Sequence, residues 1–533
     1  DVGGCPRGRA RAAGGDLMLQ QQSRRARRVV VIGFGPVAAR LIDDLRPAVR
    51  DHRLQLLVVG AEPGPAYNRI MIGELAVGRT DPEMLIMADP EELAADGVQL
   101  RLGVPVIGID RQRRFLTLGD GDQFAYDVLI FATGAAARVP DLSGLPDWEP
   151  GEDPVLPSGV TVLRDLDDAQ QLAALAMPGR ELIVLGGGVL GMELALTAAE
   201  SGTSVTLVHT GQVPMERNLD PTAAAIVSRH LRRQQVRVVA DARAAGVRLQ
   251  GKRFAALTLA DGTEISGDGM VLCCGAAPRT GLAARSGLLT KTGILVDHHL
   301  RSINDDTVYA IGDCARVRCP DSECERCRTV HAPSGLLAPG LAQAEWLASR
   351  LLADLDHQRH PEPAPSHGLP VMILKAPGLS VVSAGSIDVD PLDCLLDAGE
   401  DRRVAQWNDP DLGRYAKMIT RGGTLEGLIC VGLPRTAAEL TLLYERGAEL
   451  PSDRSALLRH DGPDHAVGGD PFGPEATICR CNGVTAGTID DAITEGHGDV
   501  VAIGRATRAG TGCGTCRDRI CELLQARTEV VVG

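Results

Sequence analysis

Four cysteines near the end of the chain have the spacing of a metal or cluster site. Cys479 and Cys481 form a C-x-C pair, and Cys513 and Cys516 form a C-x-x-C pair beyond a helix-prone insert. Four thiolates converging from two short loops can hold a zinc ion or an iron–sulfur cluster. A zinc ribbon uses two C-x-x-C knuckles, so this spacing favours [2Fe–2S] over structural zinc. We expect Cys521, which follows in a helix, to be a spare cysteine.

A second group of thiols lies upstream, at Cys314, Cys319, Cys324 and Cys327, with His331 nearby. The last three cysteines have the C-x4-C-x2-C spacing of a plant-type cluster loop. They could bind a second iron–sulfur cluster, they could hold zinc that staples the insert, or they could be uncommitted. We expect a metal here, and the sequence leaves its identity open.

The first glycine fingerprint is Gly33-x-Gly35-x-x-Ala38, inside residues 29–42, which are predicted to run from a buried strand into a helix. The first glycine makes the tight turn, and the second lets a pyrophosphate approach the backbone. The alanine permits close helix–strand packing, and the helix N-terminus offers NH groups to phosphate. Glu62 closes the next strand, where a carboxylate can bind ribose hydroxyls. The pattern predicts a dinucleotide site rather than a turn that serves packing alone.

The second fingerprint is Gly186-x-Gly188-x-x-Gly191, followed by Glu193. Its next strand ends at His209 instead of an acid, and no arginine follows immediately to hold a 2′-phosphate. This favours NADH over NADPH. The histidine could contact the ribose or could be an ordinary surface residue, and both interpretations stay open.

Composition limits the remaining possibilities. The chain has 533 residues with a net charge of −14, and this acidity argues against a nucleic-acid-binding protein. No run of eighteen apolar residues is present, so no membrane span is expected. Most of the 14 cysteines are clustered rather than spread as a disulfide framework, which favours metal sites in a reducing compartment and a cytoplasmic protein.

Strands and helices alternate around both fingerprints, which predicts α/β units with parallel sheets and ligands at the carboxyl ends of the strands. The strands expected besides the two fingerprint strands are 54–59, 126–134, 269–275 and 307–313. The last of these returns to the first unit, so the second unit is inserted in it. Residues 369–450 are strand-rich and end in a helix, and residues 484–496 read as a helix capped by Thr485.

Two further features accompany the fingerprints: the turn Ala132-Thr133-Gly134 and the strand end Gly312-Asp313. Together these motifs resemble the two-dinucleotide-binding flavoproteins. The resemblance implies FAD in the first unit, NAD(P)H in the inserted unit, and contact between Asp313 and the ribityl–phosphate region of the flavin. Disulfide reductases of that family carry a C-x4-C pair where this chain has Pro65-Ala-Tyr-Asn-Arg69, so disulfide chemistry is not expected.

The residues expected to hold FAD are Gly33, Gly35, Ala38, Glu62, Arg69, Thr133, Gly134 and Asp313, and those expected to hold NADH are Gly186, Gly188, Gly191, Glu193, His209 and Gly275. Hydride transfer to the flavin requires no side-chain acid or base, so no catalytic residue is predicted.

Three segments point to a smaller group within these flavoproteins. They are residues 66–69, 215–220 and 335–340. They resemble the large subunit of NAD(P)H-dependent nitrite reductases and, equally, the electron-transfer subunit of assimilatory nitrate reductases. The cysteine module around residues 511–516 is similar to bacterioferritin-associated-ferredoxin-like [2Fe–2S] domains. The resemblance covers residues 29 to about 520.

The fold expected is α/β, with two Rossmann-like dinucleotide-binding units, one inserted in the other, an α+β third domain and a small helical [2Fe–2S] domain. The expected boundaries are a disordered basic N-terminus at 1–28, an FAD-binding domain at 29–150 and 276–355, an NAD(H)-binding domain at 151–275, an α+β interface domain at 369–450, a linker at 451–475 and the [2Fe–2S] domain at 476–525.

Neither a siroheme-binding half nor a molybdenum-cofactor domain is visible, so another polypeptide is expected to handle the reducible substrate. We expect an NADH-dependent electron-transfer subunit that serves a separate catalytic subunit, a molybdenum-dependent assimilatory nitrate reductase. The alternatives are a reductase component for nitrite reductase, or a metal-binding partner-docking protein with a vestigial flavin fold. The intact fingerprint glycines speak against the last.

Overall fold

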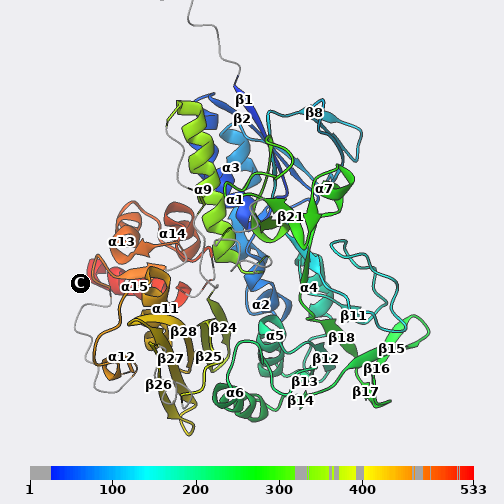
Figure 1. Ribbon diagram of the computed structural model, residues 1–533, viewed down its shortest axis with the longest axis vertical. Coiled ribbons are helices and arrows are strands. Elements are labelled where there is room, and N and C mark those ends of the chain that lie inside the picture. The colour runs from blue at the N-terminus through cyan, green and yellow to red at the C-terminus, as the bar shows by residue number, and fades with distance from the viewer. Residues whose placement is uncertain are drawn as a thin grey trace, which may run out of the picture.

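The structure is a computed structural model. It describes residues 26–318, 324, 333, 335–358, 363–364, 371–391, 401–458, 461, 472–479, 482–512, 514 and 516–532. Figure 1 shows two α/β units stacked along the long axis, with an antiparallel sheet and a small helical module on one side of them. Among the described residues, no helix combines the length and the apolar character needed to cross a bilayer.

The first unit is built on a parallel sheet of order β22-β9-β1-β2-β5. These strands are β1 (Arg27–Ile32), β2 (Leu54–Gly60), β5 (Gln99–Leu102), β9 (Val128–Phe131) and β22 (Val308–Ala310). Strands β9 and β22 are buried at every residue, because the elements around the sheet cover both faces. Helix α1 (Pro36–Arg50) packs against α9 (Leu337–Asp356), as Figure 1 shows. The chain thus leaves this sheet after β9 and returns to it at β22.

The second unit is a parallel sheet of order β11-β18-β12-β13-β14. Its strands are β11 (Val160–Thr161), β12 (Glu181–Leu185), β13 (Ser204–Val208), β14 (Arg237–Val239) and β18 (Gly269–Leu272). Helices α5 (Val189–Glu200) and α6 (Pro221–Arg233) belong to it, and α5 is apolar along nearly its whole length and largely buried. An antiparallel sheet of β15 (Ala244–Gln250), β16 (Arg253–Leu259) and β17 (Glu264–Ser266) extends from it.

A short antiparallel pair joins the two units. Strand β10 (Ala135–Ala137) runs out of the first unit, and β19 (Ala276–Pro278) runs back beside it. This pairing brings the ends of β9 and β18 together through the chain that follows each of them.

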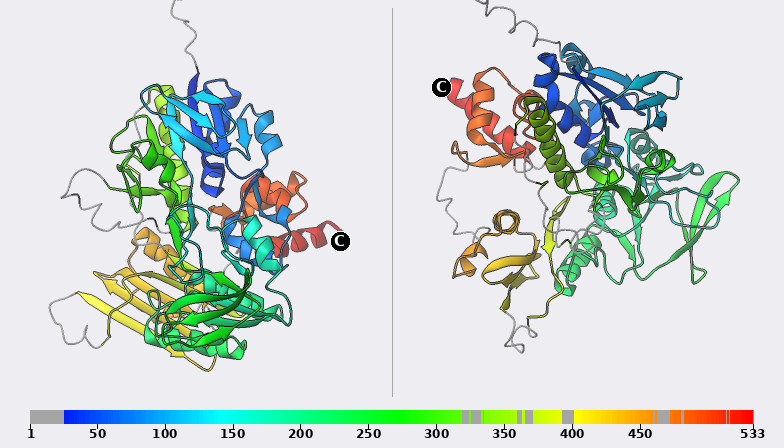
Figure 2. Two further views of the ribbon diagram at one scale, coloured as in Figure 1. Left: turned by 90° about the vertical axis from the view of Figure 1, so that its right-hand side faces the viewer. Right: turned by 45° about the horizontal axis from the view of Figure 1, so that its top comes forward.

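The third domain is an antiparallel sheet of order β24-β25-β28-β27-β26 covered by α11 (Pro434–Arg446). Its strands are β24 (Met372–Ala376), β25 (Leu379–Gly385), β26 (Arg402–Asp409), β27 (Arg414–Arg421) and β28 (Thr424–Val431). Figure 2 shows this sheet beside the second unit, and β24 packs on α5. A buried ion pair joins the two, because Lys417 Nζ lies 3.3 Å from the Asp220 carboxylate, which also accepts from Tyr415.

The C-terminal module contains β29 (Thr477–Cys479), β30 (Val484–Thr485), α13 (Ala486–Thr494), α14 (Val500–Thr507) and α15 (Arg517–Val532). It has its own small apolar core, formed around side chains such as Ile489, Ile503 and Ile520. The Thr485 hydroxyl accepts from the Thr488 amide, which confirms the predicted helix cap. Figure 2 shows the module against the first unit.

The remaining elements are short. They are β3 (Ala66–Tyr67), α2 (Ile72–Ala76), β4 (Ile86–Ala88), α3 (Pro90–Ala95), β6 (Val106–Asp110), β7 (Phe115–Leu118), β8 (Gln123–Ala125), α4 (Leu166–Ala173), α7 (Gly281–Arg285), β20 (Thr290–Lys291), β21 (Gly293–Val296), β23 (Ala315–Val317), α12 (Ser455–Leu458) and the 3₁₀ turns η1 (Arg69–Met71), η2 (Pro82–Leu85) and η3 (Gly312–Cys314).

One expectation about the N-terminus is corrected. The basic segment predicted to be disordered through residue 28 includes the start of β1, because Arg27 and Arg28 pair with β2. The guanidinium of Arg28 donates to both oxygens of Asp127, at 2.7 and 3.1 Å, so the basic side chain is used to close the end of the sheet. Residues 1–25 lie outside the described part of the chain.

Candidate functional site

The first glycine turn lies between β1 and α1, against the end of β9. Gly33 has φ of +107°, and a Cβ there would lie 2.3 Å from the Ala132 carbonyl oxygen, so only glycine fits. Gly35 caps α1 without a side chain, which leaves the first NH groups of that helix for a ligand. Ala38 is fully buried. The turn therefore has the form of a phosphate cradle.

The second turn repeats this geometry between β12 and α5. Gly186 has φ of +126°, and a Cβ there would lie 2.2 Å from the Cys273 carbonyl oxygen. A Cβ on Gly191 would lie only 1.9 Å from the Gly186 oxygen, because the helix packs directly on the turn. A Cβ on Gly188 would meet nothing within 4 Å. Two of the three glycines thus serve packing, and Gly188 borders open space where a pyrophosphate can approach.

His209 follows β13 and lies beneath this turn. A Cβ on Gly187 would meet the His209 ring at 2.9 Å, and the side chain is only 6% exposed. Its Nε2 is buried and has no hydrogen-bond partner within the part of the chain that the structure describes. Burial lowers the pKa of the imidazole. The surface interpretation of this residue is therefore wrong, and an unpaired buried nitrogen beside the glycine turn fits a ligand contact.

Two other residues expected to bind NADH, Glu193 and Gly275, lie in different environments. The Glu193 carboxylate is half-buried between α5 and the third domain, where its Oε1 accepts from the Lys375 amide at 3.1 Å. Burial raises the pKa of Glu193 to about 7. Gly275 follows β18 with φ of +97° and no atom within 4 Å of a Cβ, so it borders open space. Their proposed roles in binding NADH stay predictions.

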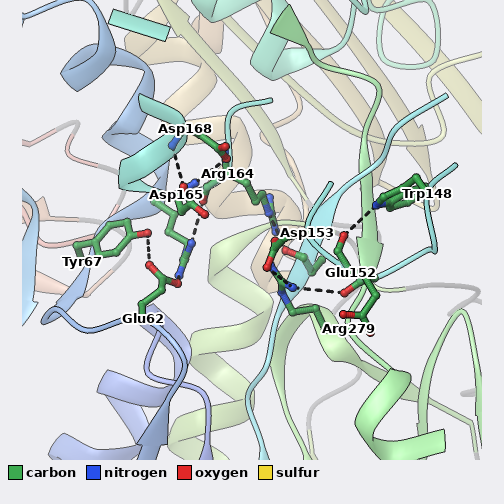
Figure 3. Close-up of polar contacts among 12 residues, drawn as sticks. Glu62, Tyr67, Trp148, Glu152, Asp153, Arg164, Asp165, Asp168 and Arg279 are labelled. Carbon is green, nitrogen blue, oxygen red and sulfur yellow. Dashed lines mark hydrogen bonds and ion pairs between the residues drawn. The ribbon is translucent and has the colours of Figure 1, made fainter. Parts of the chain in front are cut away.

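The predicted acid of the first unit belongs to a network that reaches the strand end carrying Asp313. Glu62 accepts from the Tyr67 hydroxyl at 2.7 Å and forms an ion pair with Arg69. Arg69 also donates to the Arg164 carbonyl oxygen at 2.8 Å, and Arg164 donates to Asp313 at 3.0 Å. Figure 3 shows Tyr67 and Glu62 on one side of Arg164. The structure thus brings three of the predicted FAD residues into one charged group.

Thr133 and Gly134, which follow β9, are held in place by hydrogen bonds to Arg279. The Thr133 hydroxyl donates to the Arg279 carbonyl oxygen at 3.1 Å, and the Arg279 amide donates to the Gly134 oxygen at 3.0 Å. The guanidinium of Arg279 pairs with Asp153, as Figure 3 shows. Gly134 has φ of +66° with open space around it.

Arg164 is a site residue that the sequence analysis missed. It directly precedes Asp165, which forms a capping box with Asp168 at the start of α4. Asp168 also accepts from the Arg164 amide at 2.7 Å, so the cap holds the arginine backbone in place. The D-x-x-D spacing could have indicated the helix start, but nothing local indicates that Arg164 reaches Asp313, 149 positions away.

The C-terminal cysteines lie in the core of their module as far as they are described. Cys479 and Cys516 are both buried, and Asn482 Nδ2 lies 3.8 Å from Cys479 Sγ. Cys481 and Cys513 lie outside the described residues. The same Nδ2 donates more closely to the Arg508 oxygen, at 2.6 Å, so it holds the loop while it lies near the sulfur. Two thiols in one small core with an amide donor beside one of them fit the predicted cluster. Cys521 is exposed on α15.

The two upstream cysteines that the structure describes, Cys314 and Cys324, lie in different environments. Cys314 is fully buried in the core of the first unit, with Sγ 3.3 Å from the Ile311 carbonyl oxygen, and burial raises the pKa of its thiol. Cys324 Sγ lies 3.2 Å from His298 Nε2. Cys319 and Cys327, like His331, lie outside the described residues. Metal ligation needs a thiolate, which an apolar core disfavours, so we leave Cys314 out of the proposed second site.

Comparison with protein families gives two matches. Residues 27–333 match the model of the pyridine nucleotide-disulphide oxidoreductases, and residues 477–526 match the BFD-like [2Fe-2S] binding domain. Within the described residues, no three His, Cys, Asp or Glu side chains gather as a metal site, but two of the four cysteines predicted to hold the cluster are not among those residues.

Two curated relatives match almost the whole chain. The nitrite reductase [NAD(P)H] of Bacillus subtilis (strain 168) is 29% identical over 94% of this chain and 57% of its own length. The assimilatory nitrate reductase electron transfer subunit of the same organism is 27% identical over 94% of this chain and 60% of its own length. The chain therefore spans less than two thirds of the length of these relatives.

Solved structures share the fold. The putidaredoxin reductase in its covalent complex with putidaredoxin superposes with a TM-score of 0.67 at 22% identity, covering 81% of this chain and 97% of that one. The ferredoxin reductase of the CYP199A2 system from Rhodopseudomonas palustris gives 0.63 at 24% identity, covering 79% and 97%. Together, the matches confirm the predicted α/β fold class and the predicted cofactors, namely FAD, a nicotinamide nucleotide and a [2Fe–2S] cluster.

Proposed function

Because the chain belongs to the pyridine nucleotide-disulphide oxidoreductase family, we propose that it takes electrons from NADH and delivers them, by way of FAD and the C-terminal cluster, to a separate catalytic subunit. When bound, FAD accepts a hydride from the nicotinamide and releases electrons singly to an iron–sulfur centre. The protein contributes the binding, orientation and electrostatics of the cofactors.

The first unit offers the groups that would hold FAD. The turn at Gly33 and Gly35 leaves backbone NH groups and the N-terminus of α1 for the pyrophosphate. Glu62 is positioned by Tyr67 and Arg69 at the end of β2, where it can accept from ribose hydroxyls. Asp313 is held by Arg164 at the end of β22, which places a hydrogen-bond acceptor beside the same turn.

The second unit offers the groups that would hold the nicotinamide nucleotide. Gly188 leaves room for its pyrophosphate, and the buried Nε2 of His209 has a free position for a ribose hydroxyl. A buried, largely neutral imidazole gives no cation for a 2′-phosphate, which supports NADH as the preferred donor. Stopped-flow reduction of the flavin with NADH and NADPH tests this, and faster reduction by NADPH would overturn it.

One observation carries the proposal that electrons leave through the C-terminal module. The module packs on the first unit: Arg508 pairs with Asp44 at 3.0 Å, and Arg517 donates to the Met84 carbonyl oxygen at 2.5 Å. The first contact joins the end of α14 to α1, and the second joins the start of α15, beside the cysteine loop, to the segment that follows Glu62. A tethered cluster domain that only docked a partner would not need this contact.

For the acceptor we propose a molybdenum-dependent assimilatory nitrate reductase, supported by the resemblance to an electron-transfer subunit of that system. The resemblance to a nitrite reductase of similar extent favours a second candidate, a reductase component for nitrite reduction. The purified protein should be mixed with each catalytic polypeptide and NADH. Nitrate consumption with the first supports the first choice, nitrite consumption with the second supports the alternative, and neither would refute both.

The same purified protein tests the remaining proposals. Flavin absorbance that bleaches with NADH excludes a vestigial flavin fold. Iron and acid-labile sulfide beyond one [2Fe–2S] cluster would support a second cluster at Cys319, Cys324 and Cys327, whereas zinc would support a stapled insert and neither would refute the site. The clustered cysteines also support our proposal that the protein works in the cytoplasm.

A further inference from the structure

A buried asparagine joins the FAD-binding unit to the cysteine loop of the C-terminal module. Asn68 is 1% exposed, and its Nδ2 donates to the carbonyl oxygens of Thr511, at 3.3 Å, and Gly512. The two partners lie 443 and 444 positions away in the sequence. In the sequence, Gly512 directly precedes Cys513, one of the four cysteines assigned to the cluster.

The other groups of Asn68 hold it to its own unit. Its Oδ1 accepts from the Ile70 amide at 3.0 Å, and its backbone NH donates to the Leu85 oxygen at 2.7 Å. The side-chain oxygen of Asn68 therefore binds its own turn, whereas the side-chain nitrogen binds the cysteine loop. Because both partners of the donor are backbone oxygens, the contact fixes the position of the loop rather than the position of a side chain.

The same loop touches the first unit on the other side of Cys513. Gly514 has φ of +73°, and a Cβ there would lie 3.0 Å from Met71 Sδ. The Arg517 guanidinium reaches the Met84 carbonyl oxygen. Gly512 and Gly514, which flank the cysteine, thus both contact the turn 68–71, and the second contact is tight.

This turn leads directly to the FAD-binding network. Arg69 follows Asn68 and pairs with Glu62, and it also donates to the Arg164 oxygen. Arg164 in turn binds Asp313. A continuous series of covalent and hydrogen bonds therefore runs from the strand end at Asp313 to the backbone beside Cys513.

We propose that Asn68 is a positioning residue that seats the cysteine loop on the FAD-binding unit, so that single electrons can cross there. The inference rests on the proposed function, in which NADH supplies two electrons and the [2Fe–2S] cluster takes one at a time. The second electron then waits until the external acceptor has reoxidised the cluster. Asn68 does not contact the reacting atoms in this proposal; it determines where the loop lies.

The test uses the full-length holoprotein and the variant Asn68→Asp. This substitution keeps the oxygen that caps the Ile70 amide, but it replaces the donor with a carboxylate that faces two carbonyl oxygens. The matched control is Asn304→Asp, which removes an exposed amide donor from the Gly287 oxygen, at 3.0 Å, away from the loop. Arg517→Lys, which shortens the reach to Met84, tests the same seat from the loop side should Asn68→Asp not fold.

Three measurements separate positioning from a general loss of structure. Flavin bleaching by NADH and cluster reduction are followed separately in the stopped-flow instrument, the cluster potential is measured by equilibrium titration, and hydrogen exchange is measured for peptides of the loop. In Asn68→Asp, cluster reduction should slow by at least about tenfold, exchange of the loop amides should accelerate, and flavin bleaching should not change. The Asn304→Asp control should match the wild type in all of them.

Unchanged cluster reduction and unchanged loop exchange in Asn68→Asp would overturn the inference. Slowed cluster reduction with normal loop exchange would also overturn it, since the added charge would then act on the cluster potential and not through the position of the loop. A wild-type protein whose flavin NADH does not reduce would instead refute the proposed function. The exchange measurement would still decide whether Asn68 seats the loop.

Discussion

The two glycines of the second turn offer a test in which equal chemical changes should have different consequences. Gly188→Ala and Gly191→Ala each add one methyl group, three residues apart, at the start of α5. The first methyl would enter open space, whereas the second would lie 1.9 Å from the Gly186 oxygen. We expect the first variant to fold normally and bind NADH poorly, and the second to be destabilised.

The magnitudes follow from these environments. Gly188 has φ of −81° and ψ of −175°, which alanine adopts without strain, so Gly188→Ala should cost at most about 1 kcal/mol, through the poorer helix cap. In the bound state the methyl would displace the pyrophosphate from the backbone NH groups. Losing one charge-assisted hydrogen bond costs about 1.5–3 kcal/mol, so the Kd for NADH should rise by about tenfold to 150-fold.

Gly191→Ala changes the stability of the protein in two opposing ways. Alanine is better than glycine inside a helix by about 1 kcal/mol. The methyl cannot remain 1.9 Å from a backbone oxygen, so α5 must move away from the turn. Overpacking of this kind typically costs about 1–3 kcal/mol, and a backbone contact lies at the upper end of that range. The net result should be a loss of stability of about 2 kcal/mol.

Stopped-flow reduction of the flavin over a series of NADH concentrations gives the Kd, and urea unfolding gives the stability of each variant. The wild type and Gly108→Ala, which adds a methyl group on β6 of the first unit where a Cβ would meet nothing within 4 Å, serve as references. If Gly188→Ala bound NADH with the wild-type Kd, the open space beside Gly188 would not be the pyrophosphate site. If Gly191→Ala were as stable as the wild type, the close packing of α5 on the turn would be refuted.

Three further predictions concern other parts of the molecule. Burial raises the pKa of Glu193 from 4.5 to about 7, so the folded state binds the proton more tightly and the free energy of unfolding falls as the pH rises between these values. Glu193→Gln should remove this pH dependence and should be more stable than the wild type above pH 7, by up to about 3 kcal/mol. Urea unfolding at pH 5 and pH 8 measures this, and an equal pH dependence in both proteins would contradict it. Lys417→Met should cost about 3–5 kcal/mol because it leaves the buried carboxylate of Asp220 unpaired, and adding Asp220→Asn should recover part of that loss in thermal unfolding. Cys516→Ser should abolish the paramagnetic signal of the reduced cluster while NADH still bleaches the flavin at the wild-type rate, and loss of flavin bleaching would show that the module is structural.

Much of the fold could be predicted because its signals are local. A buried strand, a glycine turn and a helix start follow one another within about fifteen residues in both units, and positive φ at Gly33 and Gly186 restricts those positions to glycine. Thr485 capped its helix as predicted, because a cap depends on the three residues that follow it. The return of the chain to the first sheet at β22 was also predicted, and the structure pairs β22 with β9.

Parts of the candidate site could not be predicted, because their partners are distant in the sequence. His209 looked equally suited to the surface, and only the packing of the glycine turn over its ring shows that its nitrogen is buried and unpaired. Cys314 belongs to the cysteine-rich insert by sequence, yet its side chain points into the core of the first unit. Side-chain direction at a strand end depends on what packs there, and spacing along the chain carries no information about that.

The sequence by itself therefore determined the chemistry available to this protein: two dinucleotide turns, a set of cluster thiols and the family they belong to. The tertiary structure decided how these parts meet. Arg164 reaches Asp313 across 149 positions, and Asn68 reaches Gly512 across 444. Such contacts depend on how the units pack together, and because many sequences satisfy the local requirements of each unit, no local pattern specifies the contact between them.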